Sequence, residues 1–414
     1  TDAREEYINH AIQSVPIDLS GMKIVVDCAE GASFYTSVEA LKELGAEVVA
    51  IHNNPDGTNI NANCGSTHME ELQARVVYEK AQVGLAFDGD ADRLLAVDEN
   101  GKQVDVLVEL KARFDEENNI VWAKMLEKAG CHVIYGLVGL KTHSKITLVV
   151  RMEEDGIRRY VHLGTGNYND ATAKLYTDIG LLTCSQSIGE DATAVFNMLS
   201  GYSEPLHWNK LSLAPLWLRE KFLSLIGRER ENVLAGKEAK IIAKMNSLCD
   251  KGIIDALYDA ARAGVKIELI VRGICCLKTG IPGISENITV RSIVGDFLEH
   301  SRIFYFWNDG KEEVYCASAD WMPRNLDRRV EILFPVLDEK LQKRVKHILD
   351  IELSDTLKAH ILNADGNYEK IDKRGKVLLC SQDYFCEEAI KEAEALLPEH
   401  SIHSRVFIPA EPAE

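Results

Sequence analysis

The sequence lacks several features that would assign it to particular classes of protein. No stretch approaches the roughly 18 to 20 apolar residues that a membrane-spanning helix needs. The first residues, TDAREEYINH, have no basic start followed by an apolar core, so they do not resemble a secretion signal. The ten cysteines are scattered without paired metal-ligand spacing, which favours reduced, mostly buried thiols. We therefore expect a cytoplasmic protein.

Positive charge is also scarce. The chain has 47 basic and 65 acidic residues, and its formal net charge of −18 argues against a general attraction to nucleic acid or to anionic membranes. A polyanionic substrate would need a local basic pocket inside this acidic protein. The basic residues that cluster along the sequence are Lys141, Lys145, Arg151, Arg158, Arg159, Arg272, Arg302, Arg324, Arg328 and Arg329.

The sequence does contain a repeated α/β pattern. Residues 23–28 (KIVVDC) and 46–51 (AEVVAI) are β-branched runs separated by an amphipathic helix, and a helix at about 69–80 and a strand at VGLAFDG follow. This part predicts an α/β domain with a parallel sheet. The pattern restarts near residue 104 and again beyond the aromatic segment GYSEPLHWNKLSLAPLW. We expect three α/β domains, at residues 1–105, 106–205 and 206–414.

The second and third of these domains look like divergent copies. One contains THSKITLVV followed by HLGTGNYNDATAKLYTD, and the other contains EHSRIFYFW followed by CASADWMPRNLDRRVE. Each copy has His-x-Lys/Arg at the start of a strand and a small polar loop roughly twenty residues later, at the end of the next strand. A duplicated fold with one site between its copies is the simplest interpretation.

The string FDGDADR predicts a metal site. Asp88, Asp90 and Asp92 alternate with small residues, and alternation in an extended loop would let three carboxylates converge on one hard cation, most naturally Mg²⁺. Arg93 would bind a phosphate beside that ion. The plainer alternative is an acidic turn that binds nothing.

The paired His-x-Lys/Arg motifs predict phosphoryl chemistry. His143 and Lys145 are two apart on an expected strand, so their side chains would project to the same face, and His300 and Arg302 repeat the spacing. An imidazole can attack phosphorus and hold the group as a phosphohistidine, while a neighbouring cation offsets the charge of the transition state. A single histidine is more often structural, but two in matching contexts favour a functional role.

Residues 1 to about 105 resemble the second domain of the phosphohexomutases, most closely that of phosphoglucosamine mutase. The strings VDCAEGA, NNPDGTNINANCGSTHMEELQ and AFDGDADRLLAVDENG carry this resemblance. It implies that Asp88, Asp90 and Asp92 are Mg²⁺ ligands and that Arg93 lies near a phosphosugar.

Residues from about 101 to the end resemble the C-terminal half of polyphosphate kinase of the first type. The resemblance rests on VLVELKARFDEENNI, YGLVGLKTHSK, YVHLGTGNYN, LYTDIGLLT, FLEHSRIFYF and SADWMPRNLDRRVE, among other strings. It implies two domains similar to the phospholipase D fold, the first of them incomplete at its start. Both family patterns therefore meet within residues 86–120.

The kinase resemblance also implies roles for individual residues. His143 resembles the histidine that ATP phosphorylates, and His300 the second essential histidine, an acid or base that also lies at the nucleotide site. Tyr176 and Arg272 match nucleotide-contacting positions. Arg113 matches a position at the Mg²⁺ and phosphate site, and because a guanidinium cannot ligate Mg²⁺ we interpret it as a phosphate clamp.

Three hypotheses about function follow. The first is a polyphosphate kinase that uses ATP, ADP and inorganic polyphosphate with Mg²⁺, has no nucleic-acid partner and forms a homo-oligomer, as the resemblance implies. The second is a phosphohexomutase-like protein that works through the DGDADR loop. The third is a chimeric chain whose catalysis is impaired by absent domains.

Overall fold

The computed structural model describes residues 3–14, 17–91, 94–102, 105–110, 116–128, 131–153, 156–201, 205 and 207–396. The chain divides into two compact units. The first unit comprises residues 1–138 and 199–203, and the second comprises residues 139–198 and 204–414. Within the described residues, no helix is both long enough and apolar enough to cross a membrane.

The first unit is built around a four-stranded sheet. Its elements are α1 (Ala3–Ser14), β1 (Lys23–Asp27), α2 (Ser33–Glu43), β2 (Glu47–Ile51), the 3-10 helix η1 (Gly65–Thr67), α3 (Glu70–Glu79), β3 (Val83–Phe87), β4 (Leu94–Asp98), β5 (Asp105–Leu107), α4 (Glu116–Lys128) and β6 (His132–Ile134). The strand order is β2-β1-β3-β4, and β4 pairs antiparallel to β3. The predicted parallel sheet is present in β1, β2 and β3, whereas β4 is antiparallel to β3 because a short connection between neighbouring strands allows only antiparallel pairing.

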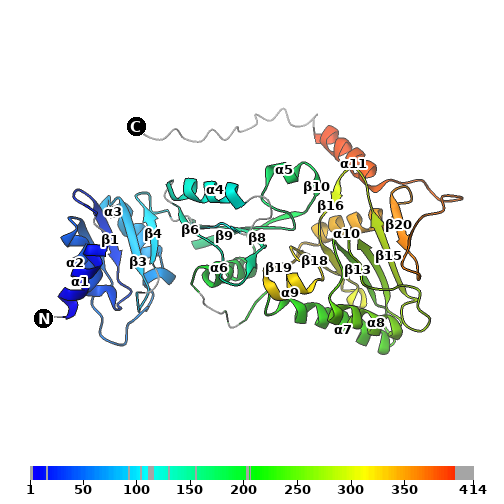
Figure 1. The fold of residues 1–414 in the computed structure, drawn as a ribbon, viewed down its shortest axis with the longest axis horizontal. Coiled ribbons are helices and arrows are strands. Elements are labelled where there is room, and N and C mark those ends of the chain that lie inside the picture. Colours follow the sequence, from blue (N-terminus) through cyan, green and yellow to red (C-terminus); the bar gives the residue numbers. More distant parts are fainter. Residues whose placement is uncertain are drawn as a thin grey trace. The chain divides into compact units, whose positions relative to one another are not determined.

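Alternate residues of β1 build two apolar layers, one on each face of this sheet. Figure 1 shows the strands of this sheet with α1, α2 and α3 around them. Val25 packs in a cluster with Val76 of α3, whereas Ile24 and Val26 pack in a second cluster with Val38 of α2. Successive side chains of a strand point to opposite faces, so a strand that is buried throughout needs a helix on each side. The β-branched run therefore specifies a strand in the middle of the sheet.

The second unit holds the rest of the described elements, except that the end of α6, from Leu199 onward, belongs to the first unit. They are β7 (Lys141–Thr142), β8 (Lys145–Glu153), β9 (Gly156–Gly164), α5 (Asp170–Ala173), β10 (Tyr176–Thr177), β11 (Gly180–Thr183), α6 (Gln186–Gly201), β12 (Ser212–Ala214), α7 (Leu218–Leu234), β13 (Lys240–Met245), α8 (Lys251–Ala263), β14 (Lys266–Val271), β15 (Ile288–Ile293), β16 (Leu298–Glu299), β17 (Ile303–Phe306), η2 (Asn308–Gly310), β18 (Glu313–Ala317), α9 (Pro323–Arg328), β19 (Arg329–Pro335), α10 (Glu339–Ser354), β20 (Ala359–Leu362), β21 (Tyr368–Lys370) and α11 (Ser381–Leu396).

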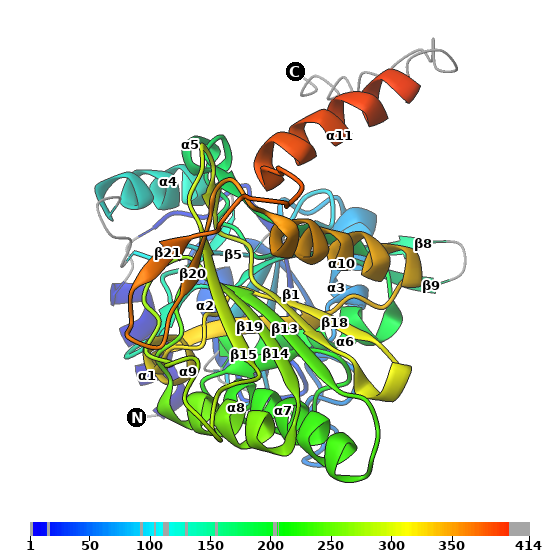
Figure 2. The ribbon, with the colours of Figure 1, turned by 90° about the vertical axis from the view of Figure 1, so that its right-hand side faces the viewer.

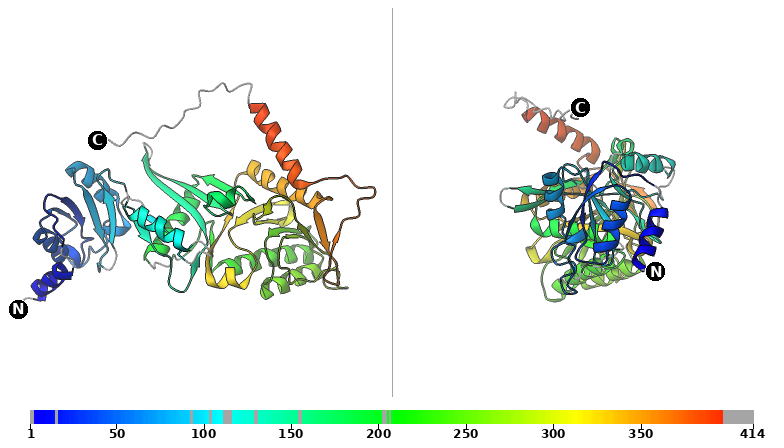
Figure 3. Two further views of the ribbon diagram at one scale, coloured as in Figure 1. Left: turned by 45° about the horizontal axis from the view of Figure 1, so that its top comes forward. Right: turned by 90° about the vertical axis from the view of Figure 1, so that its left-hand side faces the viewer.

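A large mixed sheet organises this unit, in the order β12-β19-β18-β17-β13-β14-β15-β20-β21, with β7 added beside β19. Figure 2 shows α7 and α8 on one face of the sheet and α10 on the other, and Figure 3 shows α11 extending beyond α10. Phe222 of α7, Phe304 of β17 and Trp321 are fully buried against one another, with ring centroids 4.7 to 5.4 Å apart. This aromatic cluster joins the helical layer to the sheet.

The earlier part of the second unit forms a smaller antiparallel sheet in the order β11-β9-β8. Two short parallel pairs connect it to the large sheet region, β7 with β19 and β10 with β16. The predicted α/β class is confirmed, because both units combine β-sheets with helices packed against them. The strand-and-loop order expected of a duplicated fold is also present, because polar loops follow β9 and β18 in corresponding places.

Candidate active site

The two candidate histidines lie in equivalent breaks between strands. His143 and Ser144 separate β7 from β8, and their backbone N–H groups both donate to the carbonyl of Val330, each at 2.9 Å. His300 and Ser301 follow β16, and their N–H groups donate to the carbonyl of Thr177, at 3.3 and 2.9 Å. The prediction that the histidines stand on strands is therefore wrong. Each is held at a strand end by the backbone of the other copy.

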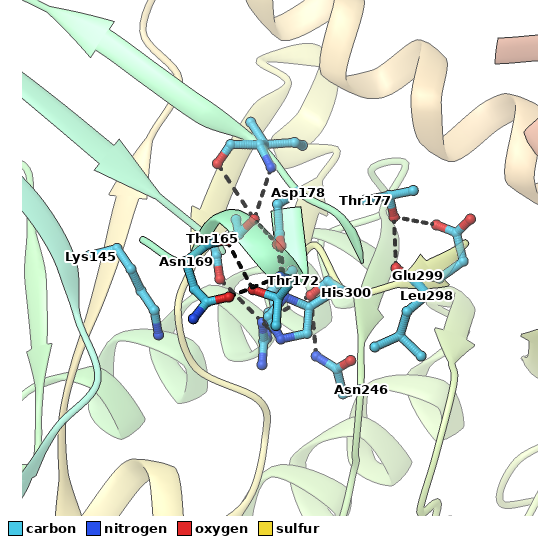
Figure 4. A network of polar contacts seen from close by, with 12 residues as sticks. Lys145, Thr165, Asn169, Thr172, Thr177, Asp178, Asn246, Leu298, Glu299 and His300 are labelled. Carbon is cyan, nitrogen blue, oxygen red and sulfur yellow. Dashed lines mark hydrogen bonds and ion pairs between the residues drawn. The ribbon is translucent and has the colours of Figure 1, made fainter. Parts of the chain in front are cut away.

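Each histidine ring is bonded to a carboxylate from the other copy. His143 Nδ1 lies 2.9 Å from Oε2 of Glu331 on β19, and His300 Nδ1 lies 2.9 Å from both carboxylate oxygens of Asp178, which follows β10. Glu331 is fully buried. A carboxylate that accepts a hydrogen bond from Nδ1–H fixes the ring orientation and leaves Nε2 as the reactive nitrogen. The two rings are thus positioned by a reciprocal exchange of carboxylates (Figure 4 shows the His300 half).

Matching hydroxyl groups orient these carboxylates. Thr165 Oγ1 donates to Asp178 Oδ1 at 2.7 Å, and Ser318 Oγ donates to Glu331 Oε2 at 2.5 Å. Each hydroxyl also accepts a backbone N–H from the residue that follows its carboxylate. Gly166 allows the approach, because a Cβ there would lie 2.3 Å from the carboxyl carbon of Asp178. The two hydroxyl residues lie in the predicted small polar loops. The sequence alone does not predict which carboxylates they contact.

Burial shifts the pKa values of His143 and its cationic neighbour. Burial, together with the charges of Lys145 and Arg329, lowers the pKa of His143 to about 4, against the opposing influence of Glu331. Burial likewise lowers the pKa of Lys145 to about 7, with Arg302 and Arg329 acting in the same direction. His143 is consequently a neutral base at physiological pH, and Lys145 is poised to gain or lose a proton.

A network of donors surrounds His300. Arg302 is buried and donates through Nη1 to the carbonyls of His300 and Thr165, at 2.9 and 3.2 Å, and Nη1 lies 3.0 Å from His300 Nε2. Its Nε donates to Asp320 Oδ1 at 3.2 Å. Burial lowers the pKa of His300 as well, assisted by the charge of Arg302. The neutral ring, with Nδ1–H toward Asp178, is the form that fits these contacts.

The two predicted nucleotide-contacting residues lie beside this network. The ring of Tyr176 lies 4.8 Å, centroid to centroid, from the ring of His300. Arg272 donates through Nε and Nη2 to Asn246 Oδ1, and Asn246 Nδ2 donates to the carbonyl of His300 at 3.2 Å. The structure thus brings Tyr176, Arg272 and His300 together, and the reciprocal pairs place His143 and Lys145 in the same region of the unit.

A buried charge cluster supports the short strand pair that presents Asp178 and His300. Lys244 Nζ donates to Glu299 Oε2 at 2.6 Å and also to Glu352. Glu299 further accepts Thr177 Oγ1 at 3.0 Å and Gln382 Nε2 at 2.6 Å. Burial raises the pKa of Glu352 to about 8. Burial alone would also raise the pKa of Glu299, but the charge of Lys244 and hydrogen bonds with Glu352, Lys244 and Gln382 lower it to about 2.

The predicted metal loop belongs to the first unit and is a tight turn. Asp88 follows β3 and is buried, Asp90 is exposed, and Ala91 has a left-handed φ of 62°. The extended, alternating geometry expected of this loop is therefore wrong for the described residues. Asp92 and Arg93 lie outside the described residues, as does Arg113.

Comparison with known proteins assigns each part of the chain. Residues 211–382 match the family model for polyphosphate kinase C-terminal domain 2, residues 91–205 the model for polyphosphate kinase C-terminal domain 1, and residues 5–101 the model for phosphoglucomutase/phosphomannomutase alpha/beta/alpha domain II.

Named relatives agree with the kinase models. The polyphosphate kinase of Halalkalibacterium halodurans is 62% identical over 66% of this chain and 39% of that protein. The enzyme of Lactiplantibacillus plantarum is 56% identical over 72% of this chain and 41% of that protein. The chain thus spans about two fifths of the length of these relatives.

A solved structure gives the same assignment. The crystal structure of polyphosphate kinase from Porphyromonas gingivalis superposes with a TM-score of 0.66 at 36% identity, and the match covers 80% of this chain and 47% of that one. The chain therefore joins a domain II of the phosphoglucomutase/phosphomannomutase family to the two C-terminal domains of the polyphosphate kinase family, to which residues 91–205 and 211–382 belong.

Proposed function

We propose that the second unit is a polyphosphate kinase that reversibly transfers the terminal phosphoryl group of ATP to polyphosphate through a phosphohistidine on His143. The proposal rests on the protonation state of the His143 ring. Its Nδ1 is bonded to the buried carboxylate of Glu331, and its lowered pKa keeps the imidazole neutral. The lone pair then lies on Nε2, the nitrogen that can attack phosphorus.

The transfer has two steps. In the first, Nε2 of His143 forms a bond to the terminal phosphorus of ATP while the bond from that phosphorus to its bridging oxygen breaks, and ADP leaves with the electron pair. The ring gains positive charge, which Glu331 stabilises through Nδ1–H. In the second, a terminal oxygen of polyphosphate attacks the same phosphorus, and the N–P bond breaks. Lys145 and Arg302 offset the negative charge that builds on the phosphoryl oxygens.

His300 serves this transfer as an acid or base in our proposal. Asp178 holds its Nδ1 proton, so Nε2 can accept a proton from the attacking phosphate or return one to the leaving phosphate. Tyr176 and Arg272 would contact the nucleotide, because the ring of Tyr176 and the guanidinium of Arg272 both adjoin the His300 network. Arg113 is proposed as a further phosphate clamp.

We infer that Mg²⁺ is the cation that this chain uses. Asp88 and Asp90 supply carboxylate oxygens from one tight turn, a donor set that suits a hard cation, and Asp92 would complete it. When bound beside a phosphate, Mg²⁺ neutralises part of its charge. ATP, ADP and polyphosphate are the proposed partners, and assembly with further copies of the chain stays a prediction.

The experiment that tests this function is phosphoryl labelling. Incubation with ATP labelled on its terminal phosphate should leave acid-labile label on the chain. The label should disappear in His143→Ala and survive in His360→Ala, a part-buried histidine outside the site. Absence of label from the intact chain would contradict the proposal. Label that survives His143→Ala but is lost in Asp90→Ala would instead support the phosphohexomutase-like hypothesis.

A further inference from the structure

A second group of potential ligands lies in the first unit, at the carboxyl ends of two adjacent parallel strands. Asp27 ends β1, and His52 directly follows β2, with Asp27 and Ile51 paired in the register of these strands. Cys64 directly precedes η1. The Asp27 carboxylate, a ring nitrogen of His52 and the Cys64 sulfur all lie within 4.8 Å of one another. Asp27 and Cys64 are fully buried.

The surrounding backbone fixes Asp27. Its Oδ1 accepts the N–H of Ala29 at 2.9 Å, and its Oδ2 accepts the N–H of Gly65 at 3.0 Å. The second of these bonds ties the loop that carries Cys64 to the end of β1. Each carboxylate oxygen still has a second lone pair, so these bonds orient Asp27 without exhausting its capacity as a ligand.

His52 is aimed at the same point but makes no hydrogen bond there. Its Nδ1 is buried and lies 3.0 Å from Asp27 Oδ2, yet the contact does not have hydrogen-bond geometry. On the other side of the ring, Nε2 lies 3.1 Å from Glu71 Oε2. His52 also has a left-handed φ of 46°, uncommon for a residue with a side chain. A buried ring nitrogen without a hydrogen bond, in a strained backbone, needs an explanation.

We propose that Asp27, His52 and Cys64 bind a thiophilic divalent cation, Zn²⁺ being the natural choice. One sulfur, one imidazole nitrogen and one carboxylate oxygen form a donor set that zinc accepts, with a water molecule as the fourth ligand. Glu71 supplies the outer carboxylate that commonly orients a metal-bound histidine. Cys64 binds as the thiolate and releases its proton to solvent.

This site differs in chemistry from the Asp88–Asp90 turn and does not depend on the proposed kinase function. The turn offers only carboxylate oxygens, which suit Mg²⁺, whereas Cys64 and His52 select softer ions. A millimolar excess of Mg²⁺ should therefore leave a thiophilic ion bound at Asp27, His52 and Cys64.

Co²⁺ is the probe that tests the proposal, because a Co²⁺–thiolate bond adds a charge-transfer absorption that oxygen ligands cannot give. Metal-free full chain titrated with Co²⁺ should develop this absorption with one ion per chain, and Zn²⁺ should abolish it by displacement. Cys64→Ser should remove the absorption, whereas Cys184→Ser, an exposed cysteine of the second unit, should leave it unchanged.

A second variant, at Glu71, tests the proposal even if Cys64→Ser misfolds. Glu71 has an exposed side chain, and Glu71→Gln should fold and weaken Co²⁺ binding about 10- to 100-fold. The proposal is overturned if the intact chain gives no thiolate absorption, if the absorption persists in folded Cys64→Ser, or if Glu71→Gln leaves the affinity unchanged. Loss of the absorption in Asp90→Ala alone would also overturn it.

Discussion

Replacing Glu331 with Gln tests how the proposed nucleophile is prepared. Glu331 is fully buried, accepts Ser318 Oγ and lies 2.9 Å from His143 Nδ1. A Gln side chain has nearly the same size, but one of its terminal atoms must face both the Ser318 hydroxyl and His143 Nδ1, because Oε2 of Glu331 makes both contacts. If the amide nitrogen takes this place, it donates to Nδ1, the ring proton moves to Nε2 and the attacking lone pair is blocked. If the amide oxygen takes it, both hydrogen bonds remain; in either case the negative charge that stabilises the phosphorylated ring is lost.

The magnitude follows from the single bond that is changed. A hydrogen bond to a charged group contributes about 1.5–3 kcal/mol, so Glu331→Gln should slow phosphorylation of His143 by about 10- to 150-fold. The assay is a single-turnover measurement of label transfer from ATP, with the fold checked by circular dichroism. Asp178→Asn is the matched control, because it alters the corresponding bond to His300.

Comparing the two variants separates positioning from general damage. Glu331→Gln should slow formation of the phosphohistidine. Asp178→Asn should mainly slow transfer to polyphosphate. An unchanged rate of phosphohistidine formation in folded Glu331→Gln would refute the assigned role of this carboxylate.

The remaining predictions concern pH, nucleotide binding and stability. The pKa of His143 is lowered from about 6.5 to about 4, so the unfolded chain binds more protons between these values. Stability from this group should therefore be lost as pH falls through that window in urea titrations; a free energy of unfolding that does not fall there would contradict the burial argument. Arg272→Ala should raise the KM for ATP about 10-fold or more with a smaller effect on kcat, since a charged hydrogen-bond donor is removed. Steady-state kinetics measures both constants, and a larger effect on kcat than on KM would contradict a role in nucleotide binding. Lys244→Met leaves the buried Glu299 carboxylate without its cation and Glu352 without its hydrogen-bond donor, and should lower the free energy of unfolding by about 3–5 kcal/mol in urea titrations. Lys251→Met, on an exposed helix position, should cost less than about 0.5 kcal/mol; equal losses would contradict the role of the buried cluster.

Local patterns predict much of this fold. The runs KIVVDC and AEVVAI form β1 and β2, and the separating helix is α2, because β-branched runs and 3.6-residue periodicity act over short stretches. The duplication predicted from THSK and EHSR places His143 and His300 in corresponding breaks. Both inferences depend on residues that are near in sequence or alike in two copies.

The missed features depend on long-range contacts. Glu331 is 188 positions from His143, and Asp178 is 122 positions from His300, so only the folded pairing of β7 with β19 and β10 with β16 brings them together. The β3–β4 turn was missed for a different reason, since alternating carboxylates suit an extended loop and a tight turn equally well.

Locating the phosphoryl group on the chain tests the central claim most directly. The chain should be incubated with ATP, digested under alkaline conditions that preserve phosphohistidine, and analysed by mass spectrometry, with ³¹P NMR to distinguish the two ring nitrogens. The predicted result is a single phosphoryl group on Nε2 of His143, because Glu331 holds Nδ1. A phosphoryl group on Nδ1, on His300 or on no histidine would contradict the account.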